Sequence, residues 1–121
     1  MQEIAVGRLT THVLDTAAGK PARQMKLSLY SLENGKRNLL KECTTNDDGR
    51  CSEPLLEGES FQKGTYELVF QVSQYFKGSA AVSNPAFLDE IPIRFSIADE
   101  KAHYHVPLLV SPWAYSTYRG S

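Results

Sequence analysis

Long apolar runs and an excess of charge of one sign are both missing from this 121-residue sequence. No stretch approaches the ~18 consecutive apolar residues of a membrane-spanning helix, so we expect no membrane span. The 13 Lys and Arg residues are balanced by 14 Asp and Glu residues, which leaves a formal net charge of −1. Nucleic-acid binding depends on clustered cations, so we expect no nucleic-acid partner either.

The usual enzyme motifs are missing as well. The sequence contains no Gly-x-Ser-x-Gly, no phosphate-cradling glycine loop and no obvious pair of carboxylates. Residues 1–7 lack the basic start and apolar run of a signal peptide. We therefore expect a cytoplasmic protein, or a periplasmic one if a signal peptide was removed before Met1.

Cysteine is scarce, since only Cys43 and Cys51 are present. They flank the turn signal of residues 46–49, so a cross-strand disulfide would form if the hairpin register placed them opposite each other. Without a visible secretory signal, two free thiols are the favoured prediction. No Cys-x-x-Cys pair exists, so no structural zinc site is expected.

What is present is alternation with a period of two. Apolar side chains at positions 66, 68, 70 and 72, for example, alternate with mostly polar ones, and Gly, Asn and Pro turn signals separate such runs. This pattern predicts an all-β chain, either a sandwich or a barrel, with a short helix within residues 73–82. The length indicates a single domain over residues 1–121. We expect seven or eight strands near residues 8–15, 24–32, 38–45, 50–56, 64–73, 90–98, 103–111 and 113–118.

The three histidines, His12, His103 and His105, fall on the strand faces opposite the more apolar ones. They should therefore point away from the core, towards solvent or a partner subunit. Three interpretations remain open: surface or interface histidines without a chemical role, a metal site, or general acid–base catalysis. A metal site would need further ligands that nothing in the sequence specifies. Neutral imidazole titrates near physiological pH and moves protons readily.

Arg50 and the C-terminal run are the other candidates. Arg50 directly follows the Asp-Asp-Gly turn, where it is either a solvated strand start or a guanidinium fork for planar oxygens or a developing oxyanion. The last residues, 118–121, are either a frayed end or the continuation of an ordered strand. In the second case the hydroxyls of Tyr118 and Ser121 would be held in one place.

Four segments together resemble the transthyretin-related family of 5-hydroxyisourate hydrolases. They are Leu-Thr-Thr-His-Val-Leu-Asp at 9–15 with Gly-Lys-Pro-Ala at 19–22, Asn-Asp-Asp-Gly-Arg at 46–50, Ala-His-Tyr-His-Val-Pro-Leu-Leu at 102–109 with Ser-Pro at 111–112, and Tyr-Arg-Gly-Ser at 118–121. The last of these marks the hydrolase branch, whereas the first and third also resemble transthyretin itself. A transthyretin-like carrier of small ligands, without catalysis, is the alternative.

The resemblance implies a sandwich of two four-stranded sheets with one short helix, assembled as a homotetramer with active sites between its dimers. It implies that His12, Arg50, His105 and Ser121 are catalytic and that His12, Arg50 and Tyr118 bind the substrate, with no cofactor and no metal. His103 stays unassigned.

The implied reaction is attack of water on a ring carbonyl of 5-hydroxyisourate, giving 2-oxo-4-hydroxy-4-carboxy-5-ureidoimidazoline in urate breakdown. One histidine, His12 or His105, would take the proton from water, and Arg50 would stabilise the negative charge that develops. Tyr118 and Ser121 would fix the substrate ring. Which histidine is the base is left open.

Overall fold

Alternating apolar side chains form a four-stranded antiparallel sheet in the order β5-β4-β7-β8. The computed structural model describes residues 6–121. The strands of this first layer are β4 (Lys26–Glu33), β5 (Lys36–Thr44), β7 (Gly64–Gln71) and β8 (Glu90–Ile97). The β4–β5 hairpin turns at Asn34 and Gly35, which both have positive φ, as tight hairpin turns require.

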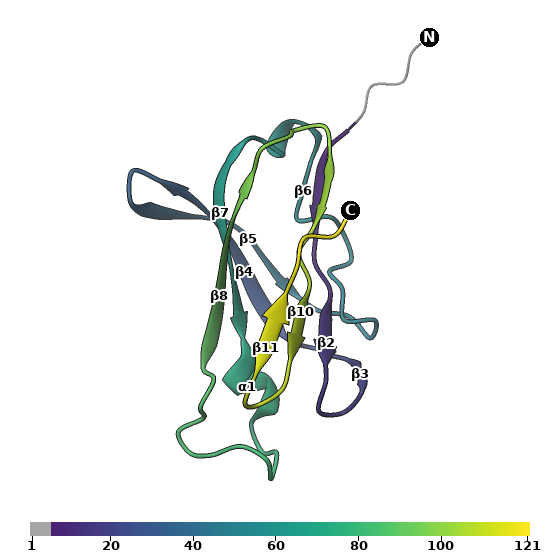
Figure 1. Ribbon diagram of the computed structural model, residues 1–121, viewed down its shortest axis with the longest axis vertical. Coiled ribbons are helices and arrows are strands. Elements are labelled where there is room, and N and C mark those ends of the chain that lie inside the picture. The colour runs from purple at the N-terminus through teal and green to yellow at the C-terminus, as the bar shows by residue number, and fades with distance from the viewer. Residues whose placement is uncertain (1–5) are drawn as a thin grey trace.

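The second layer faces the first across the core (Figure 1). It consists of a β6-β1-β9 part and a β11-β10-β2-β3 part. Its strands are β1 (Arg8–Thr10), β2 (Val13–Asp15), β3 (Lys20–Pro21), β6 (Leu56–Glu57), β9 (His103–His105), β10 (Leu108–Val110) and β11 (Tyr115–Thr117). The chain therefore has the transthyretin-like sandwich that the resemblance implied, and that prediction is confirmed.

Two strands expected to be continuous are each interrupted, at residues 11–12 and 106–107. Pro107 has no N–H to donate to a ladder, which is one reason for the break. The parallel register is nevertheless the same on both sides, since Arg8 pairs with His103 and Val13 pairs with Leu108. The second layer is thus bent at these residues without slipping in register.

Two smaller predictions concern a short strand and the helix. The expected strand over 50–56 is reduced to β6 and an isolated bridge between Arg50 and His12. The predicted short helix is present as α1 (Val72–Phe76), which begins one residue before the expected range of 73–82. It ends there because Lys77 leaves helical geometry and Gly78 follows with φ of 89°. A 3₁₀ turn, η1, covers Gly58–Ser60. Among the described residues, no helix has the length and apolar character needed to cross a membrane.

The core lies between the layers and is filled from both of them. Its largest fully buried side chains include Leu9, Met25, Leu68, Phe61 and Phe70. The alternation predicted from sequence is confirmed for the histidine strands, because Leu9, Thr11, Val13, Val106 and Leu108 are buried whereas the histidines beside them are only partly covered.

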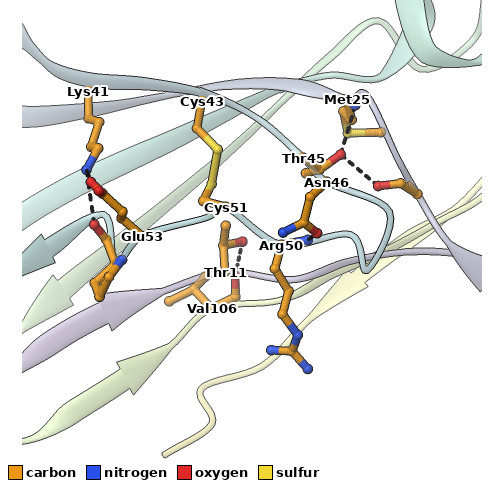
Figure 2. Close-up of a disulfide and its surroundings, with 12 residues drawn as sticks. Thr11, Met25, Lys41, Cys43, Thr45, Asn46, Arg50, Cys51, Glu53 and Val106 are labelled. Atoms are coloured by element: carbon orange, nitrogen blue, oxygen red, sulfur yellow. Dashed lines mark hydrogen bonds and ion pairs between the residues drawn. A yellow bond between two sulfur atoms is a disulfide. The ribbon is translucent and has the colours of Figure 1, made fainter.

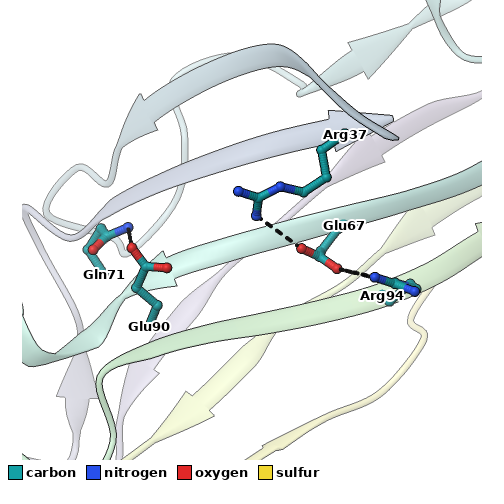
Figure 3. A network of polar contacts seen from close by, with 5 residues as sticks. All are labelled: Arg37, Glu67, Gln71, Glu90 and Arg94. Carbon is teal, nitrogen blue, oxygen red and sulfur yellow. Dashed lines mark hydrogen bonds and ion pairs between the residues drawn. The ribbon is translucent and has the colours of Figure 1, made fainter. Parts of the chain in front are cut away.

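Two buried carboxylates are fully partnered. Asp15 accepts hydrogen bonds from the backbone N–H groups of Ala17 and Ala18 and from the Tyr75 hydroxyl at 2.8 Å, which joins the turn after β2 to α1. Glu67 lies on β7 between Arg37 of β5 and Arg94 of β8 (Figure 3). In the part of the chain described, no buried side-chain nitrogen or oxygen lacks a partner.

Cys43 and Cys51 form a disulfide (Figure 2), so the prediction of two free thiols was wrong. The physical reason is the turn between them. Asn46 N–H donates to the Arg50 carbonyl at 2.8 Å, and the Asn46 side-chain oxygen accepts from Arg50 N–H at 3.1 Å. The chain is thereby folded back and the two Cα atoms are brought to 6.2 Å, within the range that a disulfide spans.

Candidate active site

The turn of residues 46–50 places Arg50 beside His12. Gly49 has φ of 76°, a conformation that glycine adopts without strain, and its carbonyl accepts from Val13 N–H at 2.8 Å. A side chain on Gly49 would collide with the Val13 carbonyl oxygen. The turn therefore lies directly against β2, where Arg50 and His12 form their isolated bridge. Figure 2 shows the Arg50 side chain extending away from this turn.

The C-terminal segment is held against β9. His105 and Gly120 exchange two backbone hydrogen bonds, of 3.2 Å and 2.7 Å. The Arg119 guanidinium lies 4.3 Å from the centre of the Tyr104 ring, a cation–π contact, and donates to the His103 carbonyl at 3.4 Å. These contacts exclude a frayed segment through residue 120 and bring Ser121 close to His105.

Thr10 lies between two histidines, a contact that the sequence analysis missed. Its hydroxyl oxygen is 2.7 Å from His103 Nε2 and 2.8 Å from His105 Nδ1. The alternation had placed Thr10 on the same face as His12, which was the available signal. Which residue Thr10 contacts on the neighbouring strand depends on the parallel register of β1 with β9, in which Thr10 pairs with His105.

These residues border an open cavity of about 450 Å³. Of the predicted site residues, Arg50, His105 and Ser121 line it, together with Arg8, Thr10, Thr11, His103 and the segment 51–54. His12 does not line it but lies beside it, with its ring centre 6.4 Å from that of His105.

Tyr118 is placed elsewhere. Its side chain is 59% exposed and lies along a separate groove that also contains Tyr104 and Val106. A single chain therefore brings four of the five predicted residues together and leaves Tyr118 apart.

Burial lowers the pKa of all three histidines below their usual value of 6.5. The Arg50 guanidinium lowers the pKa of His12 and His105 further, and His103 and His12 add to the effect on His105. For His103 the neighbouring cations are Arg8 and Arg119. At neutral pH the imidazoles are accordingly uncharged, so each can accept a proton.

A metal site receives no support from the arrangement of ligands. Within residues 6–121, no three His, Cys, Asp or Glu side chains are grouped so that they could hold a metal ion. What the cavity offers instead is a neutral base, guanidinium groups and hydroxyls, which suits acid–base chemistry on a planar, oxygen-rich molecule.

Comparison with known proteins places the chain in a family. The family model described as the HIUase/Transthyretin family matches residues 9–120. The chain belongs to the HIUase/transthyretin family. The resemblance inferred from the four sequence segments is thereby confirmed.

Relatives within the HIUase/transthyretin family match over nearly the whole chain. The 5-hydroxyisourate hydrolase of Ralstonia nicotianae is 56% identical over 96% of this chain and 100% of its own length. The structure of Klebsiella pneumoniae 5-hydroxyisourate hydrolase is 31% identical with a TM-score of 0.76, covering 95% of this chain and 94% of that one. The crystal structure of (S)-allantoin synthase is 49% identical with a TM-score of 0.91. It covers 97% of this chain, which spans only 44% of that longer protein.

Proposed function

We propose that the chain hydrolyses 5-hydroxyisourate to 2-oxo-4-hydroxy-4-carboxy-5-ureidoimidazoline, a step of urate breakdown. The observation that carries this proposal is the grouping of Arg50, His105 and Ser121 around one cavity, next to His12. The names of relatives support it, since the Ralstonia nicotianae and Klebsiella pneumoniae proteins, which match over nearly their whole lengths, are named 5-hydroxyisourate hydrolases.

In the proposed reaction His105 is the general base, because it lines the cavity whereas His12 does not. His105 takes a proton from water as the water oxygen attacks a ring carbonyl. The carbon–nitrogen bond then breaks, and the departing nitrogen takes that proton from His105. General-base help is worth ~10²–10⁴-fold.

Arg50 is the group that holds the developing oxyanion. Its guanidinium is a fixed cation beside both imidazoles, and removal of one oxyanion donor typically costs ~10²–10³-fold in rate. Ser121, which lines the cavity, and His12, which lies beside it, bind and orient the substrate ring. No cofactor enters this mechanism.

We also propose that the working form is a homotetramer with its active sites at the dimer–dimer interface. The open cavity and the exposed aromatic side chains of Trp113, Tyr115 and Tyr118 support it, because a second chain could cover them. In such an assembly Tyr118 would reach the substrate of a neighbouring copy. Light scattering should give four times the mass of one chain; a monomer at working concentration would contradict this part.

The decisive experiment generates 5-hydroxyisourate with urate oxidase and follows the decay of its absorbance with and without the protein. Acceleration is expected, and a variant lacking residues 118–121 should be nearly inactive because His105 then loses its Gly120 partner. Absence of any acceleration by the intact chain would refute the hydrolase proposal and would favour a carrier of small ligands.

A further inference from the structure

The hydroxyl of Thr10 faces two imidazole nitrogens but carries a single hydrogen. Its oxygen is 2.7 Å from His103 Nε2 and 2.8 Å from His105 Nδ1. A hydroxyl can donate one hydrogen bond and accept others, and a neutral imidazole has one N–H and one acceptor nitrogen. When both rings are neutral and Thr10 donates to one of them, the other ring must donate to Thr10, so the protonation of one ring constrains that of the other.

Two arrangements make both contacts with neutral rings and use the Thr10 hydroxyl hydrogen in one of them. In one, Thr10 donates to His105 Nδ1, so His105 carries its hydrogen on Nε2 and cannot act as a base there. In the other, His105 Nδ1–H donates to Thr10, and Thr10 donates to His103 Nε2. Of these two, only the second leaves the lone pair on His105 Nε2 free.

We propose that Thr10 and His103 are positioning residues that hold His105 in the Nδ1–H tautomer, so that its Nε2 can accept the proton of the attacking water. The kinetic part of this inference rests on the proposed function, whereas the tautomer itself does not. His103 provides the acceptor at the end of the chain of hydrogen bonds. Thr10 can connect His103 to His105 because β1 pairs in parallel with β9, which sets Thr10 opposite His105.

The surrounding charges favour neutral rings at both His103 and His105. Arg50 and His12 face His105, and Arg8 and Arg119 face His103. These guanidinium groups disfavour a positive charge on either imidazole. Gly120 lies against the His105 ring, and its backbone is paired with that of His105.

In the test, Thr10 and His103 are each replaced in two matched ways. Thr10→Val keeps the shape of a β-branched strand residue but removes the hydroxyl, and Thr10→Ser keeps the hydroxyl. His103→Leu removes the acceptor, whereas His103→Gln provides a carbonyl oxygen that can accept from Thr10. Long-range proton–nitrogen NMR of ¹⁵N-histidine protein reports the His105 tautomer, and the 5-hydroxyisourate assay gives kcat and KM.

We expect the wild type, Thr10→Ser and His103→Gln to show the Nδ1–H tautomer at His105. Thr10→Val and His103→Leu should shift His105 towards the Nε2–H form and lower kcat roughly 10- to 100-fold, less than the ~10²–10⁴-fold of a lost general base. For His103→Leu the KM should stay within about threefold, because the effect passes through His105.

An Nε2–H tautomer at His105 in the wild type would overturn the inference. So would a wild-type tautomer and kcat in both Thr10→Val and His103→Leu. A wild type that shows the Nδ1–H tautomer but no hydrolysis would refute the proposed function while supporting the tautomer assignment, so the two failures are distinguishable.

Discussion

Gly120→Ala tests how closely the C-terminal segment must approach His105. A Cβ at Gly120 would lie 3.2 Å from His105 Cβ and 3.3 Å from its Cδ2. Gly120 does not have a positive φ, so alanine adds volume there without backbone strain. Because carbon atoms prefer separations of ~3.5–4.0 Å, the imidazole or the segment must move by about 0.3–0.8 Å.

This displacement sets the expected loss of activity. A misplacement of 1 Å at a catalytic group can cost ~10²-fold, so a proportional shift of about 0.3–0.8 Å predicts a kcat roughly 4- to 40-fold lower. The free energy of unfolding should change by less than about 0.5 kcal/mol, since the residue lies near the end of the chain and away from the core.

The assay is the initial rate of 5-hydroxyisourate decay, measured beside thermal unfolding and the NMR signals of the His105 ring. Ser116→Ala is the matched control, because Ser116 is exposed in β11 and pairs with Leu109 instead of His105. Wild-type kcat in Gly120→Ala, together with unchanged His105 signals, would refute the reasoning. Equal losses in both variants would point to a general effect on the C-terminal segment.

Three further predictions follow from neighbouring features. Arg50→Gln should raise the pKa of His105 towards 6.5, since the guanidinium helps to lower it. The acidic limb of the kcat–pH profile, where activity is lost as the base becomes protonated, then moves to higher pH. An unchanged NMR titration of His105 would contradict this. Cys43→Ser opens a loop whose ends are 8 residues apart. It should lower the free energy of unfolding by about 2.5 kcal/mol at fixed protein concentration. An unchanged denaturation midpoint would disprove this value. Tyr75→Phe removes the hydrogen-bond donor to Oδ2 of the buried Asp15 carboxylate and should cost about 1–3 kcal/mol in chemical denaturation. A loss below about 0.5 kcal/mol would show that this hydrogen bond contributes little.

The sequence was informative wherever local periodicity decides the structure. Alternation predicted that His12, His103 and His105 lie away from the core, and the turn signals separated most of the strands. The family resemblance then provided the architecture and the set of candidate residues. Both depend on residues that are close in the sequence or that can be compared directly with known motifs.

The features that the sequence did not predict depend on the register between distant segments, and the periodicity of a single strand does not determine that register. The contact of Thr10 with His105 requires the pairing of β1 with β9, and the disulfide requires the Asn46 side chain to fold the turn back. The break of the expected strands at residues 11–12 and 106–107 arises in the same way, from tertiary pairing around Pro107. Tyr118 was assigned by resemblance, and a single chain does not bring it to the cavity.

The hydrogen bond between Thr10 and His105 joins residues 95 positions apart, and this bears on how the protein folds. Closing so long a loop costs chain entropy before any contact repays it, and folds rich in such distant pairings form slowly. The β4–β5 hairpin, by contrast, is a local structure that can form early. In refolding, we expect enzymatic activity to recover later than the bulk of the sheet signal, because the His105 imidazole is positioned only when β1 and β9 have paired.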